Sequence, residues 1–106
     1  MAIRDTSVDI PASVQSCIEL IATIAKPKKI VLFGSRARGV ARANSDFDLA
    51  VIKRSCTDSE WASLLVDLDE LPITLFAIDV VEFELLKSDY KEQIAKDGVV
   101  LYESDD

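Results

Sequence analysis

Helical and strand-like apolar patterns alternate along this chain, and the alternation limits the folds that it can adopt. Between residues 10 and 25 the apolar side chains recur at spacings of three and four, which predicts an amphipathic helix. The run "KKIVLFG" follows, and its apolar, partly β-branched residues 30–33 predict a short buried strand. Residues 46–53, "DFDLAVIK", predict a second strand.

The second half of the chain continues this alternation. Thr57 and Glu60 have the spacing of a capping box, and a stripe of tryptophan and leucine residues then predicts a helix that ends near Glu70. Trp61 lies in that stripe and is expected in the core. Residues 73–83, "ITLFAIDVVEF", predict a third strand that is interrupted by one acid.

A last helix near the C-terminus completes the evidence for the fold class. We expect it to run from Ser88, as its N-cap, to Lys96 and to stop before Gly98. Alternating helices and strands favour an α/β (α+β) fold, a small mixed sheet with flanking helices. The length of the chain allows one domain, so we expect a single domain over residues 1–106.

Composition and charge argue against several classes of function. The net charge of −7 disfavours binding to long nucleic acid through a basic surface. No apolar run approaches the roughly 20 residues of a membrane span, and the first ten residues do not resemble a signal peptide, so a cytoplasmic protein is expected. Without histidine, Cys17 and Cys56 lack the partners of a zinc site or a Cys–His pair.

Two aspartates occupy alternate positions in the second predicted strand. Asp46 and Asp48 share one face, about 7 Å apart, while Phe47 points to the other face and the core. If the second and third strands pair, Asp79 completes a cluster of three carboxylates, which requires a cation or a raised pKa. Mg²⁺ takes such oxygen ligands, and three acids could hold two ions. An exposed strand end with no bound metal is the alternative.

A glycine-serine turn follows the first predicted strand. Gly34 lets the backbone approach a ligand closely, and Ser35 could cap a short helix through Gly39 whose N–H groups would bind a phosphate. Arg36 and Arg38 are near enough to donate to the same anion. Two residues of helix separate their directions by about 200°, so one of them is expected to point into the site. The glycine patterns of the P-loop and the Rossmann fold are absent.

These residues together resemble the G-S-x(10)-D-x-D motif of the minimal nucleotidyltransferases, members of the polymerase-β-like superfamily. Gly34-Ser35, ten intervening residues and Asp46-Phe47-Asp48 carry the match, with Asp79 on a later strand. The resemblance covers about residues 10–102 and implies a nucleotidyltransferase core. It implies three catalytic and Mg²⁺-binding carboxylates, Asp46, Asp48 and Asp79. It further implies a set of nucleotide-binding residues, namely Gly34, Ser35, Arg36, Arg38 and Ser45.

The resemblance also implies a reaction and a partner. A hydroxyl group would attack the α-phosphorus of an NTP, with ATP expected, and pyrophosphate would leave. Minimal members are commonly encoded beside a small helical HEPN protein and act as the antitoxin of that pair, so a partner protein is the expected acceptor. Two alternatives stay open, a non-catalytic nucleotide-binding antitoxin that acts by occlusion and a small-molecule nucleotidyltransferase. Homo-oligomerisation is also left open.

Overall fold

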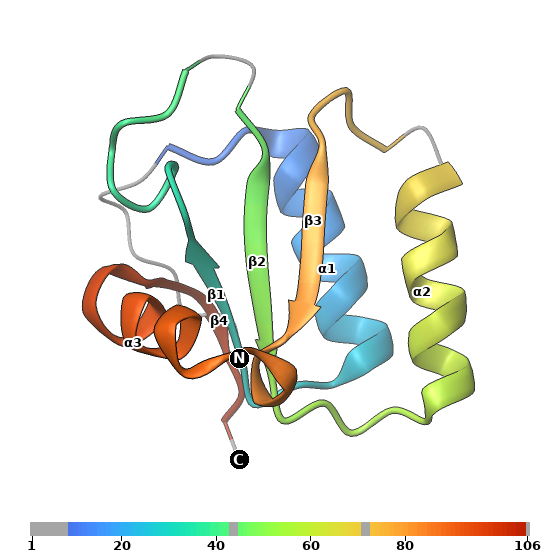
Figure 1. Ribbon diagram of the computed structural model, residues 1–106. Helices are drawn as coiled ribbons and strands as arrows, with labels where there is room; N and C mark the ends of the chain where they lie inside the picture. The colour runs from blue at the N-terminus through green and yellow to red at the C-terminus, as the bar shows by residue number, and fades with distance from the viewer. Residues whose placement is uncertain (1–8, 43–44, 71–72, 106) are drawn as a thin grey trace.

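One four-stranded sheet organises the protein (Figure 1). The computed structural model describes residues 9–42, 45–70 and 73–105. The strand order is β3-β2-β1-β4, where the strands are β1 (Lys29–Phe33), β2 (Phe47–Ile52), β3 (Ile78–Glu82) and β4 (Val99–Glu103). Strand β1 pairs antiparallel with β2 and β4, whereas β2 and β3 are parallel. The predicted mixed sheet is therefore confirmed.

Helices cover both faces of this sheet. Helices α1 (Ala12–Ala25) and α2 (Asp58–Glu70) pack on one face, and α3 (Ser88–Asp97) packs on the other, in front of the sheet in Figure 1. Most of the core lies between the sheet and the first two helices. No helix in the described ranges is long and apolar enough to cross a membrane.

The alternation of side chains along β2 decides which residues enter the core. Phe47 and Leu49 are fully buried on the face that α1 and α2 cover, while Ala50 is buried on the α3 face with Ile94. Asp48 has the same parity as Ala50 and therefore lies on the α3 face. The expectation that Phe47 points away from Asp48 is confirmed.

The start of α2 shows the predicted capping box. The Thr57 N–H donates to Oε1 of Glu60 at 2.9 Å, and the Glu60 N–H donates to Oγ1 of Thr57 at 3.1 Å. These bonds satisfy two backbone donors that a helix end would otherwise leave unpaired. Trp61 follows in the core with 8% of its surface exposed, as predicted.

Three predicted strand boundaries were wrong. Strand β3 begins at Ile78, because residues 73–77 form a turn and bends in which the Phe76 N–H donates to Oγ1 of Thr74 at 3.2 Å. A threonine hydroxyl that binds nearby backbone competes with strand pairing. Strand β2 begins at Phe47, so Asp46 precedes it. Beyond β3, residues Phe83–Leu85 form a 3₁₀ helix instead of strand.

The ends of α3 also differ from expectation. Lys87, and not Ser88, is the N-cap, because the Lys87 carbonyl accepts hydrogen bonds from the N–H groups of Tyr90 and Lys91. Gly98 does end the helix, but with a φ of −63° instead of a left-handed backbone. Its role is spatial, since a Cβ there would lie 2.7 Å from Cγ1 of Val31. Cys17 is buried and Cys56 partly buried, and both are free thiols.

Candidate active site

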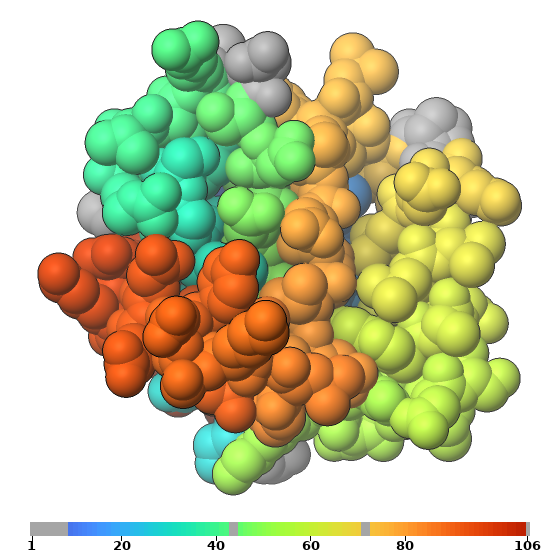
Figure 2. Space-filling view, in the orientation of Figure 1, coloured from blue at the N-terminus to red at the C-terminus, as the bar shows by residue number. Residues whose placement is uncertain are grey.

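A groove of about 540 Å³ opens on the α3 face where β1 ends and where β2 and β3 begin. Figure 2 shows the segment after β1, the start of β2, β3 and α3 meeting at the middle of this face. Its polar lining comes from the predicted motif and from α3, namely Gly34, Ser35, Arg38, Asp48, Asp79, Tyr90 and Gln93. The sheet thus brings together residues that are up to 59 positions apart in the sequence.

Gly34 makes room for the carboxylate of Asp48 at the floor of this groove. Phe33 and Asp48 are partners in the β1–β2 ladder, so the next residue of the chain, Gly34, lies beside Asp48. A Cβ on Gly34 would overlap Oδ2 of Asp48. The φ of Gly34 is +77°, a conformation that glycine adopts without the steric cost that other residues have.

Asp48 and Asp79 are direct partners in the parallel β2–β3 ladder. Pairing of these strands places two carboxylates on adjacent positions of one sheet face. Burial raises the pKa of the Asp48 carboxyl, and the negative charges of Asp79 and Asp46 raise this pKa further, while Arg38 acts in the opposite direction. Both Asp79 and Asp46 are therefore close enough for their charges to affect Asp48.

Asp46 stays at the edge of this cluster. It is exposed and precedes β2, whereas Asp48 is half-buried. Across the described ranges, no three acidic, cysteine or histidine side chains are close enough to form a metal site. The structure thus pairs Asp48 with Asp79 and leaves Asp46 nearby but apart. The chemistry of these donors still fits a hard cation, because carboxylate oxygens that repel each other are what Mg²⁺ binds.

The glycine-serine segment forms a turn, so the predicted short helix from Ser35 was wrong. The Arg38 N–H donates to the Gly34 carbonyl at 3.2 Å, and the Val40 N–H donates to the Ser35 carbonyl at 3.1 Å. These bonds span four and five residues and do not repeat, so the segment closes a loop without continuing as a helix. Ser35 lines the groove from this turn.

The turn separates Arg36 from Arg38. Arg38 lines the groove and acts on Asp48, whereas the Arg36 guanidinium stacks 4.2 Å from the ring centroid of Phe47 and 5.6 Å from that of Phe76. Phe47 belongs to the core on the opposite face of the sheet. Arg36 is therefore not among the residues that line the groove, and its expected role at the nucleotide stays a prediction.

Ser45 has a structural position beside Arg36. Its carbonyl accepts hydrogen bonds from Nε and an Nη of Arg36, at 3.3 and 2.8 Å. Its hydroxyl accepts from the Arg42 N–H at 2.9 Å. Ser45 is not among the residues that line the groove, and its expected place at the nucleotide also stays a prediction. These bonds hold the end of the β1–β2 loop just before Asp46.

Five residues that line the groove were not among the predicted site residues, namely Phe33, Val81, Leu86, Tyr90 and Gln93. Tyr90 and Gln93 are three residues apart and share one face of α3, whereas Leu86 lies in the extended segment before the helix. The helical spacing can be seen in the sequence, but no residue pattern indicates which face of the sheet α3 covers. Tyr90 is 50% exposed and presents an aromatic ring and a hydroxyl beside the aspartates.

Comparisons with known proteins agree with this geometry. The family model described as "Polymerase beta, Nucleotidyltransferase" matches residues 15–106. The protein adenylyltransferase MntA of Aphanizomenon flos-aquae (strain 2012/KM1/D3) is 34% identical over 99 residues, which covers 81% of this chain and 63% of MntA. The chain thus spans less than two thirds of the length of this relative.

Two solved structures share the fold. A chain in the crystal structure of a toxin-antitoxin with AMP-PNP has a TM-score of 0.61 and 24% identity, covering 90% of this chain and 76% of that chain. A protein described as a minimal nucleotidyltransferase has a TM-score of 0.59 and 25% identity, covering 89% of this chain and 97% of that one.

Proposed function

Because this chain belongs to the polymerase β nucleotidyltransferase family, we propose that it transfers AMP from ATP to a hydroxyl group of a partner protein. The observation that carries the proposal is the pairing of Asp48 with Asp79 beside the Gly34 turn. The name of the 34% identical relative, a protein adenylyltransferase, supports the choice of AMP and of a protein acceptor.

Each polar residue of the groove is assigned its own role in nucleotidyl transfer. Gly34 allows the phosphates to approach the backbone closely, and the Ser35 hydroxyl donates to a phosphate oxygen. Arg38, the arginine that lines the groove, stabilises the negative charge of the phosphates. The acceptor oxygen attacks the α-phosphorus, the bond from this phosphorus to the bridging oxygen breaks, and pyrophosphate leaves. The acceptor proton passes to a carboxylate, for which Asp79 is placed at the exposed side of the pair.

We assign the binding of Mg²⁺ to Asp46, Asp48 and Asp79. When bound, Mg²⁺ neutralises phosphate charge and polarises the reacting oxygens, which is the usual contribution of metal ions to phosphoryl transfer. The raised pKa of Asp48 supports this assignment, because a cation would relieve the repulsion that causes part of the shift. Catalysis then rests mainly on positioning and on charge stabilisation.

The proposed acceptor is a helical HEPN-type protein that acts as a toxin, with this chain as its antitoxin. The similar fold in a toxin-antitoxin structure supports a role of this kind. One alternative is favoured by a specific observation. Because the described acids do not form a three-ligand metal site, the chain could instead neutralise the toxin by occlusion, without catalysis.

An assay with labelled ATP distinguishes AMP transfer from neutralisation by occlusion. The protein is incubated with α-labelled ATP and Mg²⁺, with and without the partner, and the products are resolved on a gel. We expect label on the partner with the wild type and none with Asp48→Asn or with EDTA. Asp67→Asn on α2 removes the same charge from an exposed position and should label normally. Absence of label with every variant, together with a stable complex, would establish occlusion and overturn the transferase proposal.

A further inference from the structure

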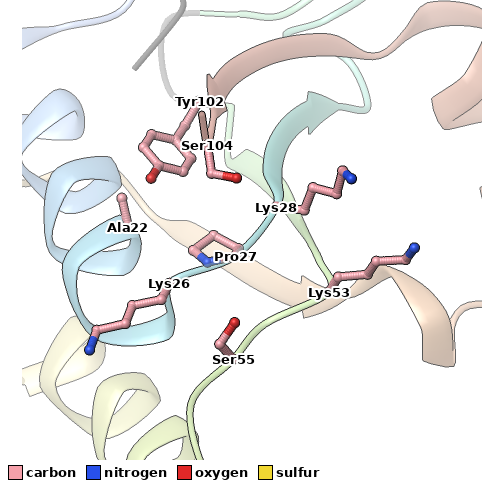
Figure 3. Close-up of a pocket in the computed structure, with 8 residues that line it drawn as sticks. All are labelled: Ala22, Lys26, Pro27, Lys28, Lys53, Ser55, Tyr102 and Ser104. Carbon is pink, nitrogen blue, oxygen red and sulfur yellow. The ribbon is translucent and has the colours of Figure 1, made fainter. Parts of the chain in front are cut away.

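A second pocket, of about 530 Å³, lies at the other end of the sheet from the aspartates. It is formed where α1 ends, where β1 begins and where β2 and β4 end (Figure 3). In the β1–β2 ladder, Phe33 and Asp48 mark the catalytic end and Lys29 and Ile52 mark the opposite end. Four residues of strand separate the two ends by about 13 Å, so this pocket is distinct from the groove.

Three lysines line this second pocket in a chain whose net charge is −7, namely Lys26, Lys28 and Lys53. None of the three takes part in an ion pair within the part of the chain that the structure describes. The neighbouring Lys29 differs, because its ammonium lies 3.6 Å from a carboxylate oxygen of Glu103. Some negative charge lies nearby, because the Lys53 N–H donates to Oε2 of Glu84 at 3.0 Å and Lys26 acts on Glu60. Like charges repel one another, and a bound anion would reduce the repulsion that remains.

Hydroxyl groups complete the lining. Figure 3 shows the hydroxyls of Ser55, Tyr102 and Ser104 around the middle of the pocket, with Lys26 on one side and Lys28 and Lys53 on the other. Ammonium and hydroxyl groups are the donors that phosphate oxygens accept from, and the tyrosine ring adds an aromatic surface. The volume is within the range of about 300 to 1,000 Å³ that small-molecule sites occupy.

The backbone at two of these lysines is unusual. Lys26 and Lys53 have φ values of +47° and +54°, and among the described residues they are the non-glycine positions with positive φ. Each such position costs about 1 to 2 kcal/mol for a residue that carries a side chain. Glycine or asparagine would be less strained at each of these two positions. Each position nevertheless carries a lysine, and both lysines line the same pocket.

From these observations we propose that the pocket of Lys26, Lys28 and Lys53 binds a small phosphorylated ligand of the nucleoside phosphate class, at a site separate from the groove. Lys28 and Lys53, whose ammonium groups lie on the same side of the pocket in Figure 3, bind the phosphate oxygens, Lys26 adds positive charge from the other side, and the hydroxyls bind the rest of the ligand. A long nucleic acid is disfavoured, because the rest of the surface is acidic and three cations supply few phosphate contacts.

A titration of the ¹⁵N-labelled protein with ADP in EDTA tests this site. We expect the amide signals of Lys28, Lys53, Ser55 and Ser104 to move, and to move equally in Asp48→Asn. The variant Lys26→Gln/Lys28→Gln/Lys53→Gln should bind ADP at least about tenfold more weakly at this site. The matched control Lys87→Gln/Lys91→Gln/Lys96→Gln removes the same charge from the α3 region and should keep the wild-type affinity.

A second variant separates binding from folding. Lys26→Gly/Lys53→Gly relieves the backbone strain, so it should melt at a higher temperature than the wild type and still bind ADP more weakly. Shifts confined to Gly34, Ser35 and Arg38 would show that ADP binds in the groove alone and would overturn the proposal. Tighter binding of a polyglutamate peptide than of ADP would overturn it in favour of an acidic protein segment.

Discussion

The carboxylate of Asp48 lies against the backbone of Gly34, in the space where a side chain at residue 34 would begin. Two independent constraints therefore act on one residue, the space taken by Oδ2 of Asp48 and the positive φ of +77°. Strand β2, which carries Asp48, and the turn that begins at Gly34 must therefore fit each other at this point. A change at either residue should affect the other.

We expect Gly34→Ala to reduce nucleotidyl transfer about 100-fold, because the new Cβ displaces the Asp48 carboxylate and small displacements of catalytic groups have effects of that size. The chain supplies a matched control in Gly39→Ala. Gly39 has a φ of +72° with nothing within 4 Å of a Cβ, so this change has the same backbone cost without the overlap. Both variants should therefore have lower melting temperatures than the wild type, but only Gly34→Ala should have the lower rate of AMP transfer. Equal activities would show that the contact does not position Asp48.

Asp48→Asn should stabilise the fold at neutral pH while it abolishes transfer. The pKa of Asp48 is raised in the folded protein above its ordinary value of 3.8, so the folded state holds this proton more tightly than the unfolded state. Stability then falls as the pH rises from 3.8 through the raised pKa, and it stays lower above that range. Asparagine does not ionise, so Asp48→Asn avoids this loss of stability. We expect a gain of about 1 kcal/mol or less, after allowance for solvent screening, that disappears below pH 3.8 in urea unfolding.

A divalent cation should reverse the shift at Asp48. Carboxyl ¹³C titration of the wild type should give a pKa for Asp48 that falls when MgCl₂ is added, because the cation favours the ionised form. Asp79→Asn should also lower the pKa of Asp48, because Asp79 is the charged neighbour that raises this pKa most. Arg38→Gln should raise the pKa of Asp48, because it removes a positive charge that lowers it. A pKa of Asp48 that does not respond to Mg²⁺ would argue against its assignment as a ligand.

Local signals in the sequence were sufficient for much of the fold. The capping box of Thr57 and Glu60 depends on residues three positions apart and forms as expected. The alternation around Asp48 fixed its face, because a strand has only two faces. The start of β3 was missed because the hydroxyl of Thr74 binds the backbone of Phe76, a local bond that outweighs the strand propensity of the apolar run.

The site could be predicted only as far as its motif reaches. Gly34, Ser35, Asp46 and Asp48 define that motif, and all of them line the groove except Asp46. Arg38 and Asp79, which were predicted with the motif, also line the groove. The direction of Arg36 depends on two rings, one of which lies 40 residues further along the chain. Such contacts between distant residues are set by packing, and no local pattern encodes them.

Substitutions of Arg36 and Arg38 should therefore have different effects, the first on stability and the second on activity. Arg36→Ala removes the stacking on Phe47 and two hydrogen bonds to the Ser45 carbonyl, so we expect a loss of about 1 to 2 kcal/mol in the free energy of unfolding.

Arg38 is exposed and lines the groove, so Arg38→Ala should remove the proposed contact to the phosphates and leave the packed interior unchanged. We expect a normal melting temperature and a fall of about 10- to 100-fold in kcat/KM for ATP, the effect of losing one or two charged hydrogen bonds. Urea unfolding and initial rates of labelled AMP transfer, measured on both variants, provide the comparison. If Arg36→Ala lost activity at full stability while Arg38→Ala stayed active, Arg36 would be the arginine that turns into the groove, and the two assignments would exchange.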